Sequence, residues 1–192
     1  MSGIELVITN LEEVKAGLKK KEAQVIKAVN ATTNDFKSRG HGWISQEVTQ
    51  AYAIKKKDVT QTKKGAKING KVSVAGVKLN NVEIEYRGSL LTPVHFKMTP
   101  KKRPARKGYR VSVEIKKGNK VRLPKDVFLA DNSGGTEIPF QREGTERLPI
   151  KSVKTVSVPQ MITNKDTADR IQTRINTELE KRLAHNLERF NK

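Results

Sequence analysis

The last quarter of the chain carries its clearest periodic pattern. Apolar residues recur there at steps of three and four positions: Ala168, Ile171, Ile175, Leu179, Leu183, Leu187 and Phe190. These steps place side chains on one face of an α-helix. Asn164 stands at the expected N-cap, and Asp166 and Asp169 suit the positive end of the helix that follows. The chain must therefore fold around a long terminal helix that buries one stripe.

A second helical stripe lies near the N-terminus. Its members are Leu11, Val14, Leu18, Val25, Ile26, Val29 and Phe36. Asn10 can cap this helix, and Glu13 completes a capping-box pattern. The pattern predicts a helix running to about Ser38. Gly40-His-Gly42 is then expected to break it, and residues 45–53 are expected to form a second, short helix.

Between the helices the apolar period falls to two, which is typical of strands. Candidate strands cover residues 68–77, 82–86, 94–98, 109–115, 121–130, 137–141 and 148–158, the cleanest being 109–115. Pro159 is expected to end the last of them, because proline cannot donate a ladder hydrogen bond. The order of elements predicts an α+β fold, in which an antiparallel sheet is packed by the long N-terminal and C-terminal helices. We predict a single domain over residues 1–192.

The positive charge of the chain is concentrated in its middle third. The formal net charge is +19, and residues 55–125 hold 21 Lys or Arg against four Asp or Glu. Both flanking segments are nearly neutral. This asymmetry indicates a polyanionic partner, which is either nucleic acid or an acidic protein surface.

The densest basic cluster lies within residues 100–108, where two prolines and five basic residues predict an exposed loop. Its members are Lys101, Lys102, Arg103, Arg106 and Lys107. No nucleic-acid-binding signature accompanies the cluster, and aromatic residues are too sparse for a stacking platform. Contact with DNA should then be weak, salt-sensitive and independent of sequence. A loop that faces an acidic protein fits the cluster equally well.

The sequence gives no reason to expect catalysis. His41, His95 and His185 are far apart, and none has a second ligand at metal-binding spacing. Glu83 and Glu85 alternate with apolar residues, which favours a solvated sheet face over an acid–base pair. Cysteine is absent, so thiol chemistry and disulfides are excluded. We expect no enzyme activity, no cofactor and no metal.

The apolar runs are too short to span a bilayer, and no signal peptide is visible. We therefore expect the protein to be made in the cytoplasm and to have no contact with membranes.

Four short motifs, taken in order, resemble a known family. They are Ile54-Lys-Lys-Lys-Asp-Val59, Gly88-Ser-Leu-Leu to Pro93 with Phe96 and Pro100, Val127-Phe-Leu-Ala130, and Arg147-Leu-Pro-Ile150 followed by Val158-Pro159-Gln-Met161. The last of these is similar to the C-terminal hallmark of the prophage minor tail protein Z family. The resemblance covers about residues 10–190 and marks Arg147, Pro149, Ile150 and Pro159 as family-motif residues.

The resemblance implies a structural role in tail completion and head–tail joining, at the head-proximal end of a phage tail. It implies no activity and no cofactor. We expect a homo-oligomeric ring in the virion tail, in contact with other tail and connector proteins. A nonspecific nucleic-acid-binding protein that uses the basic middle segment is the alternative, and a phage toxin or nuclease is a weaker one.

The C-terminal motif also has a physical interpretation. Pro149 and Pro159 restrict the backbone at two corners, which bracket an extended segment and set where the last helix starts. On this interpretation the motif serves mainly to mark where one element ends and the next begins. A sharper hypothesis makes Arg147 a buried ion-pair partner.

Overall fold

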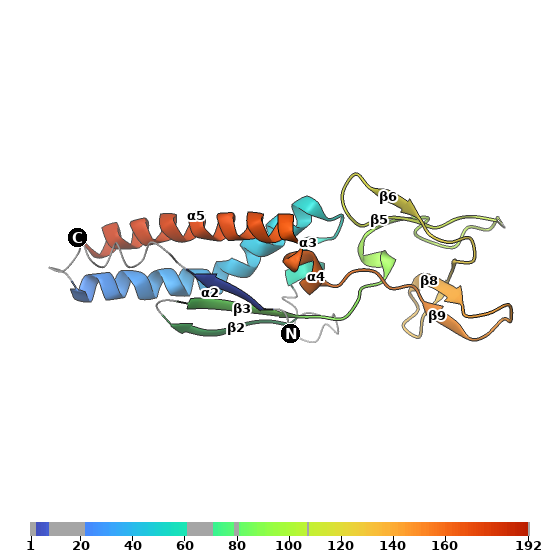
Figure 1. The fold of residues 1–192 in the computed structure, drawn as a ribbon, viewed down its shortest axis with the longest axis horizontal. Coiled ribbons are helices and arrows are strands. Elements are labelled where there is room, and N and C mark those ends of the chain that lie inside the picture. Colours follow the sequence, from blue (N-terminus) through green and yellow to red (C-terminus); the bar gives the residue numbers. More distant parts are fainter. Residues whose placement is uncertain (1–2, 8–21, 61–70, 79–80, 107, 192) are drawn as a thin grey trace.

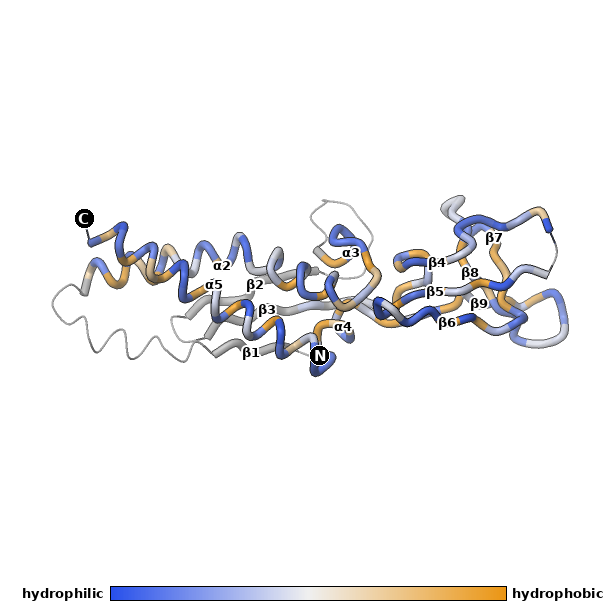
Figure 2. The backbone as a smooth tube through the Cα atoms, turned by 90° about the horizontal axis from the view of Figure 1, so that it is seen from above, coloured by the Kyte–Doolittle hydropathy of each residue, from blue (hydrophilic) through white to orange (hydrophobic). Residues whose placement is uncertain are grey.

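The computed structural model describes residues 3–7, 22–60, 71–78, 81–106 and 108–191. The molecule is elongated, with a helical part at one end and a β-rich part at the other (Figure 1). Figure 2 shows the same two parts from above, with β4, β5 and β6 far from the C-terminal end of α5. The N-terminal and C-terminal segments both belong to the helical part.

Two long antiparallel helices form the helical part, α2 (Glu22–Ala51) and α5 (Lys165–Phe190). Two short helices accompany them, α3 (Lys56–Thr60) and α4 (Val158–Thr163). A three-stranded antiparallel sheet lies alongside in the order β1-β3-β2, with β1 (Gly3–Val7), β2 (Lys71–Lys78) and β3 (Asn81–Arg87).

Two further three-stranded antiparallel sheets form the β-rich part. The first contains β4 (Lys97–Thr99), β5 (Ser112–Glu114) and β6 (Lys120–Arg122), in that order, and follows the short 3-10 helix η1 (Pro93–His95). The second contains β7 (Phe128–Asp131), β8 (Glu137–Arg142) and β9 (Ile150–Ser152).

The chain enters the β-rich part after β3 and returns from it before α4, and the two crossing segments are hydrogen-bonded together. The Leu91 amide donates to the Val156 carbonyl over 3.3 Å, and the Thr155 amide donates to the Leu91 carbonyl over 2.7 Å. The Thr155 hydroxyl donates to the same carbonyl. This pairing fixes where the β-rich part begins.

The larger hydrophobic core lies between the helices and extends into the β-rich part. From α2 and α5 it buries Phe36, Ile44, Val48, Ile171, Ile175 and Leu179. The same core also contains Leu91 from the segment that follows β3, Phe96 from the end of η1 and Val113 from β5. A smaller core inside the β-rich part consists of Met98, Val111, Val127 and Leu129. Because Phe96 and Val113 join the larger core, the two parts share apolar packing.

The predicted α+β class is confirmed, and the terminal helix follows its predicted stripe. The strands, however, divide among three small sheets where one was expected. Four candidate strands are wrong in extent. β4 begins only after η1, and β5 keeps three residues of the 109–115 segment. Residues 121–130 divide between β6 and β7, and β9 keeps three residues of the 148–158 segment. The predicted N-cap at Asn10 and the first three residues of the N-terminal stripe, Leu11, Val14 and Leu18, lie outside the described residues.

The predicted helix break at Gly40-His-Gly42 is wrong, because α2 runs unbroken through both glycines. Gly40 packs against the ring of Phe36, where an added Cβ would come within 3.0 Å of ring atoms. Burial of Ile44 and Val48 against α5 and its neighbours continues the helix beyond this point. Tertiary packing therefore outweighs the low helix propensity of the two glycines.

The two helix starts near the C-terminus also differ from expectation. Pro159 does not end a strand. It lies in the first turn of α4, where the missing N–H costs nothing. Ser157 caps this helix, and its capping box with Gln160 is complete. Asn164 is the N-cap of α5, as predicted, but its side chain caps no backbone N–H. Its carbonyl instead accepts the amides of Thr167 and Ala168.

Within the described residues, no helix is both long enough and apolar enough to cross a membrane.

Candidate basic interface

The outer face of the β4-β5-β6 sheet carries charged and polar side chains. Its register places Lys97 opposite Glu114 and Glu114 opposite Lys120. A second row across the sheet contains Thr99, Ser112 and Arg122. The alternating residues Met98 and Val113 are buried on the other face. The strand period thus separates an apolar inner face from a polar outer face, which we call the basic outer face because it carries three cations and one carboxylate.

Glu114 is the acidic residue at the centre of this face. The Gly118 amide donates to Glu114 Oε1 over 2.9 Å, and Lys97 Nζ lies 3.0 Å from Glu114 Oε2. The amide of Gly118 and the ammonium group of Lys97 hold the pKa of Glu114 below its ordinary value of 4.5. Gly118 has a φ of +81°, which glycine adopts without strain. The carboxylate therefore fixes the turn that leads into β6.

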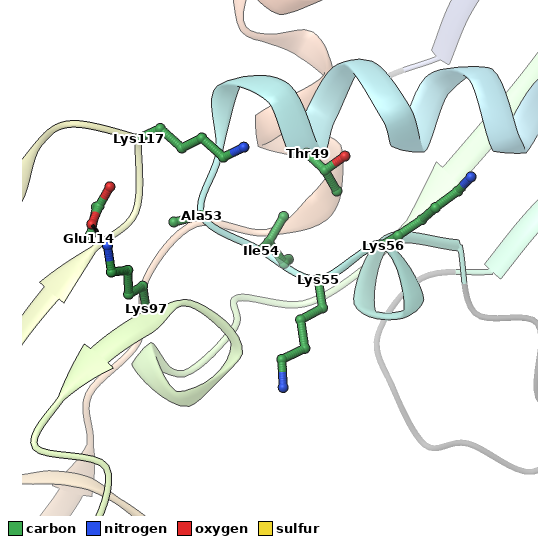
Figure 3. A pocket seen from close by; sticks show the side chains of 8 residues that line it. All are labelled: Thr49, Ala53, Ile54, Lys55, Lys56, Lys97, Glu114 and Lys117. Atoms are coloured by element: carbon green, nitrogen blue, oxygen red, sulfur yellow. Dashed lines mark ion pairs between the residues drawn. The ribbon is translucent and has the colours of Figure 1, made fainter.

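A hollow of about 580 Å³ lies between this sheet and the end of α2. Its lining residues are Thr49, Ala53, Ile54, Lys55, Lys56, Lys97, Glu114 and Lys117. In Figure 3, Lys117 points towards Thr49, Lys97 lies beside Glu114, and Lys55 and Lys56 point in different directions. The lysines outnumber the single carboxylate, so the hollow is basic, but the amines do not converge on one point.

Backbone pairing fixes the rim of the hollow. The Ala53 amide donates to the Ile115 carbonyl over 2.8 Å, and the Lys117 amide donates to the Ala51 carbonyl over 2.9 Å. The turn after β5 thus binds the last turn of α2. The sequence drew attention to the Ile54-Lys-Lys-Lys tract. It gave no sign of the hollow, because Lys97 and Lys117 reach it only through the tertiary fold.

The basic loop lies at the far end of the β4-β5-β6 sheet. Lys101, Lys102, Arg103 and Arg106 are exposed, and Lys107 lies outside the described residues. The Arg103 amide donates to Glu137 Oε2 over 2.9 Å, which ties the loop to β8. Since Lys101 follows β4 closely, this cluster continues the basic outer face of the sheet.

Comparison with protein families explains why the motifs occur in this order. The family model of prophage minor tail protein Z (GPZ) matches residues 1–192, the whole chain. The chain belongs to this family. No curated protein and no solved structure matches it. Membership in the minor tail protein Z family identifies a phage minor tail structural protein. It also implies a location in the virion tail and contact with other phage structural proteins.

The residues of the minor tail protein Z motif occupy two places in the fold. Arg147 is exposed in the hairpin between β8 and β9, so the hypothesis of a buried ion pair is wrong. Its carbonyl accepts a hydrogen bond from Arg142 Nη1 over 3.4 Å. The carbonyl of Pro149 accepts the Glu143 amide, and Ile150 begins β9. Pro159 lies in the first turn of α4, apart from the other three.

The histidines do not gather with acidic residues into a metal site. In the part of the chain that the structure describes, no three His, Asp or Glu side chains lie together as metal ligands. His95 Nδ1 lies 3.9 Å from Asp58 Oδ2, which is mostly buried. This contact joins η1 to α3 at the junction of the two parts. It could not be predicted from the sequence, because His95 and Asp58 are far apart along the chain.

Proposed function

We propose that this chain is a noncatalytic structural component that completes the phage tail and joins it to the head. The observation that carries the proposal is the family match over all 192 residues. The shared core through Phe96 and Val113 supports a single domain that acts as one rigid unit. A rigid unit of this kind suits a component that holds neighbouring proteins in place and catalyses no reaction.

We further propose that copies of the chain form a ring around the tail axis. A component on that axis must match cyclic symmetry, which head-to-tail contacts between subunits supply. Its partners are then other tail and connector proteins. The ring closes on the growing tail, so the isolated chain can be a monomer.

Microscopy of intact phage particles tests this function. The chain carries a small electron-dense label at its C-terminal end, and particles with the unlabelled chain serve as the control. We expect label at the upper end of the tail, next to the head. Label along the tail tube or at its tip contradicts head–tail joining, and absence from purified virions contradicts a structural role altogether.

The exposed basic loop favours a second candidate function, nonspecific contact with phage DNA. Lys101, Lys102, Arg103 and Arg106 stand close in sequence and are all exposed, as contact with phosphates requires. This function is compatible with a tail position, because DNA passes through the head–tail junction.

A further inference from the structure

Strand β6 is an open edge of its sheet. In the order β4-β5-β6 it pairs with β5 on one side, and no other described strand pairs with it. All three of its residues, Lys120, Val121 and Arg122, are exposed. An open edge presents unpaired backbone groups to which another extended chain can bind.

The register shows which backbone groups point outwards. The Leu123 amide donates to the Val111 carbonyl over 2.9 Å, so these two residues form a hydrogen-bonded pair. Hydrogen-bonded and non-hydrogen-bonded pairs alternate along an antiparallel ladder. The Val113–Val121 pair is then hydrogen-bonded, whereas Lys120 and Arg122 form non-hydrogen-bonded pairs. The N–H and C=O groups of Lys120 and Arg122 therefore face away from β5.

The side chains of β6 define a pattern of charge and hydrophobicity. Lys120 and Arg122 belong to the basic outer face, opposite Glu114 and Ser112. Val121 lies on the inner side next to Val113, yet it is 50% exposed, whereas Val113 is 1% exposed. One further strand beside β6 would cover Val121 and would bring its own outer side chains next to two cations.

We propose that β6 binds an extended segment of another protein with an acidic–apolar–acidic pattern, which adds a fourth strand to the sheet. The acidic side chains would pair with Lys120 and Arg122, and the apolar side chain would cover Val121. That the partner is another protein of the phage tail rests on the proposed function, whereas the pattern that β6 binds rests on the strand itself.

Two observations favour a protein strand over nucleic acid at this site. Glu114 places a negative charge at the centre of the outer face, where it opposes a phosphate. The open backbone groups and the half-exposed Val121 match a peptide strand and have no counterpart in a phosphate backbone.

A second copy of this chain is a poor occupant. The matching pattern in its own strands is Glu83-Ile84-Glu85, in the centre of β3. Both sides of β3 are already paired, with β1 and with β2. The partner is therefore a different protein. The competing explanation is that Lys120 and Arg122 only protect an exposed edge from aggregation.

The test uses the full-length protein and a blocked peptide that alternates Glu and Val. Binding is followed by fluorescence anisotropy, and hydrogen exchange is measured at the amides of Lys120 and Arg122. We expect saturable binding and slower exchange at these two amides. A peptide that alternates Glu and Ser has the same charge but little β propensity, and it should bind more weakly. A Lys–Val peptide should not bind.

Two substitutions at one position separate the charge from the backbone hydrogen bond. R122Q and R122P remove the same charge, but only R122P also removes the outward N–H, and proline is tolerated on an edge strand. We expect R122Q to weaken binding about two- to fivefold, and R122P to weaken it a further two- to tenfold. K181Q removes an exposed charge on α5 and should change nothing.

The proposal is overturned if no peptide binds, which leaves edge protection as the role of the two cations. It is also overturned if R122P and R122Q bind alike, or if the Glu–Ser peptide binds equally well. Protection of the same two amides by a 20-base-pair DNA duplex, in place of the peptide, would make nucleic acid the occupant. These measurements use isolated protein, so their failure leaves the tail position of the chain untouched.

Discussion

Asn186 Nδ2 donates a hydrogen bond to Thr32 Oγ1 over 3.1 Å and so joins α5 to α2. Both side chains are buried, at 2% and 6% exposure. The Thr32 hydroxyl in turn donates to the Ala28 carbonyl over 2.8 Å, and Asp35 Oδ2 accepts a second, longer bond from Asn186. This polar link lies among apolar side chains of an interface that also contains the Arg170–Glu47 ion pair. It fixes the alignment of the two helices along their length, because sliding either one leaves buried polar atoms unpaired.

Replacing Asn186 by Ala should therefore destabilise the protein. The change removes two hydrogen bonds and leaves a small cavity between the helices. We expect the free energy of unfolding to fall by about 1–3 kcal/mol. Urea denaturation followed by circular dichroism measures it. T177A, at an exposed position on α5, is the control and should change stability by less than about 0.5 kcal/mol. Equal effects of the two substitutions would show that the Asn186 link contributes nothing.

Two tyrosines should respond in opposite directions to the loss of their hydroxyl groups. The Tyr86 hydroxyl is buried and has no hydrogen-bond partner among the described residues, and burial raises its pKa far above the ordinary value. The Tyr109 hydroxyl accepts the Leu129 amide over 2.8 Å. We expect Y86F to stabilise the protein by about 1 kcal/mol and Y109F to destabilise it by about 1 kcal/mol. Thermal unfolding of both variants checks the signs. Destabilisation by Y86F would reveal a partner for that hydroxyl.

The terminal helix was predictable because its apolar stripe is long and regular. Ile171, Ile175 and Leu179 are all buried in the larger core, as their spacing predicted. The contribution of Asn186 was not predictable, because its partner Thr32 lies 154 positions away. The unbroken path of α2 through Gly40 was missed for a similar reason. Local propensity opposes a helix there, and the packing that overrides it comes from distant residues.

The candidate interface could be predicted only in part. The cluster around Arg103 stood out because its charge is local in sequence. The basic outer face did not, since it depends on the register that places Lys97, Glu114 and Lys120 in one row. Arg147 shows the opposite error. Its place in the family motif suggested a buried ion pair, but the β8–β9 hairpin exposes it to solvent.

The stabilising effect of Glu114 should depend on pH. Its pKa is lower in the folded protein than in the unfolded chain, through the Gly118 amide and Lys97. The carboxylate therefore stabilises the fold above the unfolded pKa, and this effect is lost as the pH falls through the lower, folded pKa. We expect E114Q to lower the Tm at pH 7, and we expect its difference from the wild type to shrink as the pH falls below the ordinary value of 4.5.

Thermal unfolding at several pH values measures the difference between E114Q and the wild type. E180Q, at an exposed glutamate on α5, provides the control and should follow the wild type throughout. A Tm difference for E114Q that is constant from pH 7 to pH 3 would mean that the carboxylate's charge has no part in fixing the turn.

The basic loop should bind duplex DNA weakly and without sequence preference. Its exposed cations can displace counterions from phosphates, so the binding constant should fall steeply as salt rises. Replacing Lys101, Lys102, Arg103, Arg106 and Lys107 by Gln removes up to five phosphate contacts. The slope of log K against log salt should then flatten by up to about four. Fluorescence anisotropy with two unrelated duplexes between about 50 and 200 mM salt measures this slope.

The matched comparison for the DNA experiment is a variant with K120Q and R122Q, which removes cations from β6 and leaves the loop intact. If the loop contacts DNA and β6 contacts protein, this variant should keep most of the wild-type salt slope. A loss proportional to the number of charges removed, wherever they lie, would show that DNA responds only to net charge. Tight binding to one of the two duplexes would instead argue for a sequence-specific regulator. Absence of binding at low salt would leave an acidic protein as the partner of the loop, because the same exposed cations still need a counterpart in the assembled tail.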